Sequence, residues 1–276
     1  MAEIVAGFML PHDPLIASIP DAPPLQKRET CMAAYAAIVE RIKDLNVDTV
    51  IVIGDDHYTM HSPACIPRCL IGIGDVEGPW EEWLGIPRAK IENNEALAHH
   101  IMQTGFDVGV DWAVAKTLVI DHSTTIPIHY AVRPAAGVRA IPVYLNTGFE
   151  PLISSRRAYQ IGKVIGEAVA SWSGTERVAI YGTGGLSHWP GMAQMGKINV
   201  EWDRKILSHV EEGNVEALIA LTDDEILRDG GNGGLEIKNW ICAMGALGTV
   251  RGELIAYESV PEWVCGCGYL EMKRAA

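Results

Sequence analysis

Four histidines lie where the sequence predicts strand ends or loops bounded by proline and glycine: His12, His57, His122 and His188. At such positions a side chain can face a cleft, because loops carry binding and catalytic residues more often than the core does. A lone histidine there is more often structural, since its imidazole satisfies a backbone carbonyl as easily as it binds a metal. Four of them favour a functional cluster.

Glu236 completes a set of side chains that could hold a divalent metal. Two neutral imidazoles, from His12 and His57, and the carboxylate of Glu236 would occupy one face of an iron(II) ion and leave three positions open. These positions could accept a substrate that chelates through two oxygens, with dioxygen beside it. We therefore expect an iron(II) site with His12, His57 and Glu236 as the metal ligands.

Other roles for these residues remain open at this stage. Glu236 could instead be a carboxylate that is stabilised by the N-terminus of a helix. Three aspartates are rival ligands, or could support a ligand from behind: Asp13, Asp55 and Asp56. His122 and His188 are candidates for acid–base catalysis because imidazole titrates near neutral pH, but each could also be a hydrogen-bonded loop residue.

The elements that would position these residues alternate between strand and helix. Periodicity predicts buried strands over residues 4–10, 50–53, 139–145 and 177–181, and helices over residues 26–45, 93–104 and 157–172. The segment 61–87 is rich in proline and glycine, so we expect it to be irregular or an inserted hairpin. Residues 201–250 are predicted to be mostly helical, and Glu236 follows a glycine-rich turn.

This alternation predicts an α/β fold, with a central mixed or mostly parallel sheet flanked by helices on both faces. Sites in such folds form beyond the ends of the strands, which is where His12 and His57 are expected. Within the 276 residues no linker-like segment separates two units, so a single catalytic domain, 1–276, is predicted.

Composition excludes several classes of partner. The net charge of −13 and the lack of a basic cluster argue against nucleic acid. No apolar stretch is long enough for a membrane span and the N-terminus lacks a basic start, so we expect a cytoplasmic protein without a membrane partner. The six cysteines are expected to be reduced thiols.

Short motifs along nearly the whole chain resemble the class III extradiol ring-cleaving dioxygenases, the family of the protocatechuate 4,5-dioxygenase catalytic (beta) subunit. The matching motifs, in the family's order, are Pro11-His12, Asp55-Asp56-His57, Asp121-His122-Ser123, Gly185-Leu186-Ser187-His188, Glu201-Trp202-Asp203-Arg204 and Gly234-Leu235-Glu236-Ile237-Lys238-Asn239-Trp240. The resemblance implies a non-haem iron(II) enzyme that uses O2 to open a dihydroxylated or amino-hydroxylated aromatic or pyridine ring.

The resemblance also implies roles for the five site residues. His12, His57 and Glu236 would be the iron ligands, His188 would take a proton from the substrate hydroxyl, and His122 would lie near the bound oxygen. The expected partners are a small aromatic or heteroaromatic diol and O2. The chain itself is expected to form a homo-oligomer.

Two features depart from the family pattern. Asp55 stands where relatives commonly have asparagine, which adds a negative charge near the metal. No segment resembling the small alpha subunit of the two-subunit enzymes is fused here, so a lid would come from residues 61–87, a neighbouring protomer or a separate small subunit.

Two other classes of function stay open on sequence alone. The same ligands could hold zinc in a metal-dependent hydrolase, or the fold could serve as a non-catalytic binding protein. The substrate is also undecided. Four basic residues are candidates to pair with a substrate carboxylate: Arg68, Arg88, Lys197 and Lys238.

Overall fold

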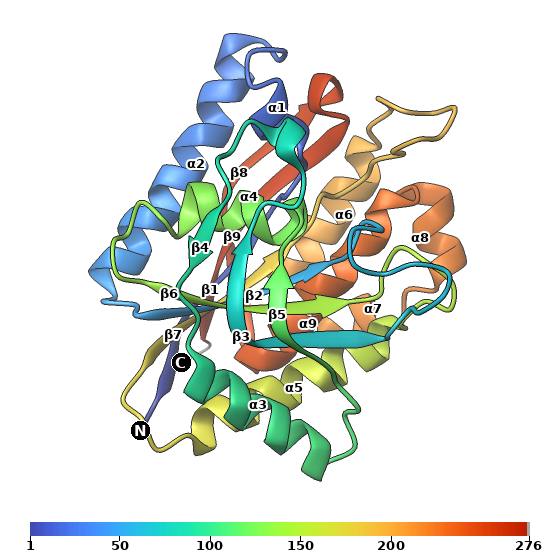
Figure 1. The fold of residues 1–276 in the computed structure, drawn as a ribbon. Helices are drawn as coiled ribbons and strands as arrows, with labels where there is room; N and C mark the ends of the chain where they lie inside the picture. Colours follow the sequence, from blue (N-terminus) through green and yellow to red (C-terminus); the bar gives the residue numbers. More distant parts are fainter. Residues whose placement is uncertain (275–276) are drawn as a thin grey trace.

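The computed structural model describes residues 1–274, which form one mixed nine-stranded sheet with helices on both faces (Figure 1). The strands are β1 Glu3–Leu10, β2 Thr49–Asp55, β3 Cys69–Gly78, β4 Ala89–Ile91, β5 Ala113–Val119, β6 Arg139–Leu145, β7 Arg177–Thr183, β8 Val250–Val260 and β9 Cys265–Arg274. The helices are α1 Leu15–Ser18, α2 Leu25–Asp44, α3 Glu95–Asp107, α4 His122–Ala131, α5 Ser155–Ser171, α6 Val200–Glu211, α7 Val215–Ile219, α8 Asp223–Asp229 and α9 Ile237–Leu247. Short 3-10 turns are η1 Glu82–Leu84, η2 Gly233–Glu236 and η3 Pro261–Trp263.

The strand order is β4-β3-β6-β2-β7-β1-β9-β8, and β5 pairs with β3 outside this path. The central strands β6, β2, β7 and β1 run parallel to one another. Antiparallel pairings then extend the sheet on both sides, through β3 next to β6 and through β9 next to β1. This arrangement confirms the predicted α/β fold with a mixed sheet.

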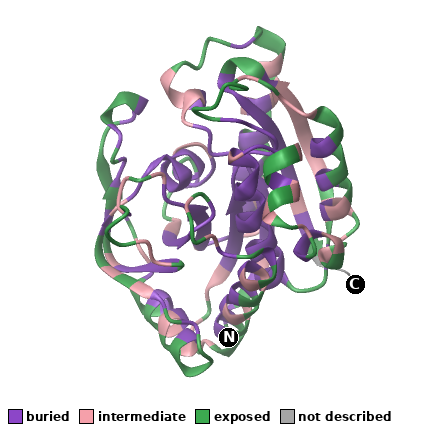
Figure 2. Ribbon diagram, turned by 90° about the vertical axis from the view of Figure 1, so that its right-hand side faces the viewer, coloured by how far each residue is buried: buried purple, intermediate pink, exposed green. Residues whose placement is uncertain are grey.

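The central strands are buried on both faces, and their side chains alternate between two cores. In β2, Ile51 and Ile53 pack into the core that contains α3, α5 and α9, whereas Val50 and Val52 pack into the core that contains α2 and α4. Figure 2 shows buried residues through the middle of the molecule and exposed residues on the outer helix faces. Burial on both faces explains why these strands are apolar runs rather than alternating ones.

Most predicted elements lie within a few residues of the observed ones, and β6 has the predicted bounds. The segment 61–87 differs, because it contains β3, which belongs to the main sheet between β6 and β4. Three of its glycines, Gly72, Gly74 and Gly78, serve close packing: a Cβ on Gly74 would lie 2.3 Å from the backbone oxygen of Lys116 in β5. The register between β3 and β5 shifts at this point, between Gly72 and Asp75.

No helix within residues 1–274 is both long and apolar enough to cross a bilayer. All six cysteines are free thiols, as expected.

Candidate metal centre

Three neighbouring central strands bring the sequence-predicted site residues to one edge of the sheet. The order β2-β7-β1 places the segments that follow these strands side by side, and all three strands run in the same direction. His12 follows β1, His57 follows β2 and His188 follows β7. The fourth histidine, His122, begins α4, and Glu236 ends the turn η2 that leads into α9. All five residues line one cavity.

Glu236 lies at the centre of this cluster. One carboxylate oxygen, Oε2, is 3.2 Å from Nε2 of His12, and the other, Oε1, is 3.5 Å from Nε2 of His57. The backbone N–H of Gly185 donates to Oε2 at 2.8 Å. Burial alone would raise the pKa of Glu236, but His188 and His12 outweigh it and hold the pKa well below its usual value. Glu236 is therefore ionised.

The tautomer of His12 follows from its partner Thr183. Nδ1 of His12 lies 3.0 Å from the Thr183 hydroxyl, whose oxygen is also within hydrogen-bond distance of the backbone carbonyls of Ile53 and Ser123. The hydroxyl has one proton, which it donates to a carbonyl, so Nδ1 of His12 must be the donor. In the neutral imidazole, Nε2 then carries the lone pair. This atom is buried and has no hydrogen-bond partner among the described residues.

His57 is held in the same way by Asp121. Oδ2 of Asp121 accepts from Nδ1 of His57 at 2.9 Å and from its backbone nitrogen at 3.1 Å. Although burial would lower the pKa of His57, Asp55 and Asp121 raise it well above its usual value. The same carboxylates also favour the binding of a divalent cation. Such a cation would displace the proton from Nε2 of His57.

Two of the three rival aspartates have other partners. Asp55 lies 3.9 Å from Nε2 of His12 and 3.8 Å from Nε2 of His57, slightly farther than Glu236. Its two oxygens accept hydrogen bonds from Asn239 and Thr147, both buried. Asp56 accepts from the residues that follow it, Thr59, Met60 and His61, and so organises the loop after β2.

His122 is oriented by Glu81, a residue that sequence reasoning missed. Oε1 of Glu81 accepts from Nδ1 of His122 at 2.7 Å, so Nε2 of His122 is left without the proton. The His122 ring lies 4.0 Å from the His57 ring, centroid to centroid. Burial and the neighbouring His57 lower the pKa of His122, so it is neutral at neutral pH. Glu81 lies in the segment 61–87, and no local signal pointed to its partner 41 residues away.

His188 also contacts the carboxylate of Glu236. Its Nδ1 donates to the backbone oxygen of Leu186 at 2.9 Å, and its Nε2 lies 3.2 Å from Oε1 of Glu236. Burial would lower the pKa of His188, but Glu236 raises it to about 10. A cation bound to Glu236 would compete with this interaction and bring the pKa of His188 back toward its usual value. Gly233 allows the approach, since a Cβ there would lie 2.1 Å from Nε2 of His188.

The cavity has a volume of about 210 Å³ and is lined by both polar and apolar residues. Its polar residues are His12, Asp13, His57, His122, His188 and Glu236, and its apolar residues are Pro14, Leu15, Pro190, Met195 and Val264. Burial raises the pKa of Asp13 to about 7, and His188 opposes this shift. A divalent cation at the centre would likewise oppose this rise in the pKa of Asp13. The mixture suits a flat, largely apolar ligand with a few polar substituents.

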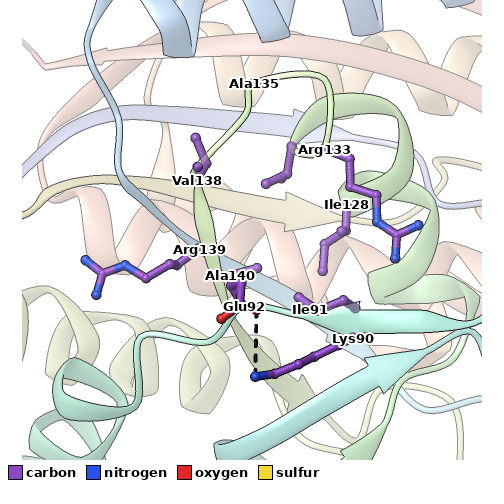
Figure 3. A pocket seen from close by; sticks show the side chains of 11 residues that line it. Lys90, Ile91, Glu92, Ile128, Arg133, Ala135, Val138, Arg139 and Ala140 are labelled. Carbon is purple, nitrogen blue, oxygen red and sulfur yellow. Dashed lines mark ion pairs between the residues drawn. The ribbon is translucent and has the colours of Figure 1, made fainter.

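A larger cavity, of about 360 Å³, lies away from the histidines, between β4, the start of β6 and the end of α4 (Figure 3). Its charged residues include Arg133 and Arg139, on opposite sides, and Lys90, which is 3.7 Å from Glu92. Because no histidine or cysteine lines it, this cavity offers none of the chemistry of the first.

The donor set fits a divalent metal. Nitrogen or oxygen atoms of His12, Asp55, His57 and Glu236 lie within 4.8 Å of one another, the separation expected around one ion. Nε2 of His12 is buried without a hydrogen-bond partner among the described residues and lies 3.2 Å from Oε2 of Glu236, which is the position of a metal ligand. Each of the two histidines donates from Nδ1 to a partner behind it, which is how proteins orient imidazole ligands.

Fold and cluster together define an α/β protein with a centre of two histidines and one or two carboxylates. A family model described as the catalytic LigB subunit of aromatic ring-opening dioxygenase matches residues 6–268. The chain belongs to this family, which confirms the resemblance seen in the motifs.

Relatives support the same assignment. The 2,3-dihydroxyphenylpropionate/2,3-dihydroxicinnamic acid 1,2-dioxygenase of Photorhabdus laumondii is 25% identical over 303 residues, which cover 92% of this chain and 93% of that protein. The protein of the same name from Paraburkholderia xenovorans is 27% identical over 293 residues, covering 88% and 90%. The crystal structure of an uncharacterized Escherichia coli K12 protein is similar in fold, with a TM-score of 0.57 and 10% identity, covering 96% of this chain and 98% of that one.

Proposed function

We propose that this chain is an iron(II) extradiol dioxygenase in which His12, His57 and Glu236 hold the metal. One observation carries the proposal: the Nε2 atoms of His12 and His57 lie 3.2 and 3.5 Å from the two oxygens of Glu236, beside an open cavity. Two neutral imidazoles and one carboxylate on one face of iron(II) leave positions for a chelating substrate and O2. Asp55 would then support the site from behind, through its bonds to Asn239 and Thr147.

The proposed substrate is a small dihydroxylated aromatic compound, in keeping with the names of the relatives. Iron(II), when bound, would align this substrate with O2 and pass electron density between them. His188 is the proposed base: its Nδ1 is committed to Leu186, so Nε2 is the atom that can take a proton from a substrate hydroxyl. His122, neutral and fixed by Glu81, presents Nε2 as the second polar contact of the pocket.

We also propose that residues 1–276 act as one catalytic domain. Supporting this, the C-terminal strand β9 pairs with the N-terminal strand β1 in the same sheet. A homo-oligomer, a separate small lid subunit and a cytoplasmic location remain predictions, the first two of which sedimentation of the purified protein would test. Within the segment 61–87, Glu81 hydrogen-bonds His122, which lines the pocket, and this contact supports the insert as part of the cover.

The first experiment is anaerobic reconstitution with iron(II), followed by oxygen uptake and absorbance scans with catechols, gallates, aminophenols and hydroxypyridones. We expect stoichiometric oxygen uptake with the appearance of a ring-opened chromophore. His12→Ala should lose both iron and activity, whereas His99→Ala, an exposed histidine on α3, should keep both. Tight zinc binding without oxygen uptake would support the hydrolase alternative, and failure to bind any metal would support the non-catalytic one.

A further inference from the structure

Asp13 places a second carboxylate inside the cavity, next to the proposed metal ligands. It follows His12 directly, and only 8% of its surface is exposed. Oδ1 accepts from the backbone nitrogen of Leu15 at 2.8 Å, which fixes the side chain. Oδ2 accepts no hydrogen bond within residues 1–274, so it is available to a ligand. The proposed iron site does not use this carboxylate.

The cavity also lacks a fixed positive side chain. Among the described residues that line it, none is lysine or arginine, and the acidic ones are Asp13 and Glu236. The four basic residues considered as partners of a substrate carboxylate all lie elsewhere. Arg88 pairs with Glu77, Lys197 lies 4.5 Å above the ring of Trp189, Lys238 pairs with Asp223, and Arg68 is exposed outside the cavity.

These two observations select against a substrate that carries its own carboxylate. A ring with a carboxylate substituent would bring that charge next to Asp13, with no lysine or arginine among the described lining residues to pair with it, and like charges in contact disfavour binding. A hydroxyl or amino substituent would instead donate a hydrogen bond to Oδ2 of Asp13. The apolar residues Pro14, Leu15 and Met195 suit the ring itself.

We propose that this enzyme acts on a diol or aminophenol without a carboxylate substituent, and that Asp13 determines this specificity by accepting a hydrogen bond from an uncharged hydroxyl or amino group on the ring. The inference rests on the proposed function. It separates this chain from the relatives described above, whose names give a propionate and a cinnamic acid as substrates.

The test compares matched substrates on the iron-loaded enzyme. One pair is protocatechuate and its primary amide, which differ in charge, and the other is pyrogallol and catechol, which differ in one donor. We expect kcat/KM to favour the amide over the acid, and pyrogallol over catechol, by about tenfold or more, because a site that bonds a substrate hydroxyl discriminates strongly against its absence. Anaerobic calorimetry should give the same order for the dissociation constants.

Asp13→Asn should bring both ratios close to one, since the amide keeps an oxygen for Leu15 but carries no charge. Asp13→Ser provides a second variant that can still accept from Leu15. Asp21→Asn is the matched control: it removes the same charge from the same segment, but its side chain is exposed and pairs with Arg28 outside the cavity. Its ratios should stay at the wild-type values.

Two results would overturn the inference alone: a wild-type enzyme that opens protocatechuate faster than its amide, or ratios that Asp13→Asn and Asp13→Ser leave unchanged. If the iron-loaded wild type opened none of the four rings, the proposed function itself would fail, and the assignment of Asp13 with it.

Discussion

Asp121 accepts two hydrogen bonds from His57, one from its ring nitrogen Nδ1 at 2.9 Å and one from its backbone nitrogen at 3.1 Å. Asp121 itself is fully buried, and its other oxygen accepts from the Ser123 hydroxyl at 2.7 Å. The His57 ring is therefore fixed relative to its own backbone. This relationship fixes the ring of the proposed ligand His57 in advance, although His57 is the least buried of the five site residues.

We expect Asp121→Asn to weaken iron(II) affinity by about 10- to 100-fold, because partners behind metal-bound histidines commonly have effects of this size. The amide can present its nitrogen to the ring, which would turn His57 or change its tautomer. Anaerobic titration against a chromogenic chelator would measure the affinity.

Glu81→Gln is the matched control for that variant, because Glu81 holds Nδ1 of His122 as Asp121 holds Nδ1 of His57. It should leave iron affinity unchanged and lower kcat. Equal losses of iron in the two variants would mean that His122 is a ligand, which a grouping of His12, His57 and His122 would allow.

Glu236→Gln and Asp55→Asn separate the two carboxylates that lie near the histidines. Glu236→Gln should lower iron affinity by more than about 100-fold, since it removes the charge closest to both Nε2 atoms. Asp55→Asn should retain iron within a few-fold, because an amide can still serve Asn239 and Thr147. The proposed ligand set is wrong if Asp55→Asn loses the metal and Glu236→Gln keeps it.

The positions of the histidines could be predicted from the sequence better than the residues that hydrogen-bond to them. Apolar runs ending at Pro11 and Gly54 predicted that His12 and His57 follow strands, and parallel pairing of those strands with β7 brings the ends together. Glu81 and Thr183 gave no such signal. Their importance comes from partners 41 and 171 residues away, and contacts of that range depend on strand order, which local periodicity does not contain.

Lys238 shows a related limit, because its type suggested an exposed charge or a substrate contact. In the fold it is fully buried, and its Nζ lies 2.7 Å from Oδ1 of Asp223, which is partly exposed. Burial lowers the pKa of Lys238, and Asp223 opposes this shift. A single sequence cannot reveal that this lysine, on the apolar helix α9, pairs with an aspartate on α8.

Removing the two members of this pair should have unequal effects on stability. Lys238→Met should change the free energy of unfolding by no more than about 1 kcal/mol, because the remaining Asp223 can be hydrated. Asp223→Ala should cost about 3 kcal/mol, because it leaves the buried ammonium without a partner. Urea denaturation of the metal-free proteins would measure both, and equal losses would contradict this account.

Asp203 should make stability depend on pH. Its oxygens accept from the backbone of Ser187 and from the Tyr257 hydroxyl, each at 2.7 Å, and burial raises its pKa above the usual 3.8. The folded state then binds the proton more tightly than the unfolded state, so this residue contributes less stability as pH rises from 3.8 through the folded pKa.

Comparison with Asp203→Asn isolates this effect. As pH is lowered from neutral toward 4, the wild type should gain stability relative to the variant, whatever the other groups contribute. Thermal unfolding at several pH values would show it, and a pH-independent difference in stability would refute it.

The position of β9 between β1 and β8 has a consequence for biosynthesis. Translation delivers His12 and His57 well before Glu236 and before β9, which pairs with β1. A nascent polypeptide that lacks these segments has the two imidazoles but neither the proposed third ligand nor the complete sheet. Because metal affinity of this kind is coupled to folding, we expect iron loading only after α9 and β9 have been synthesised and have joined the sheet.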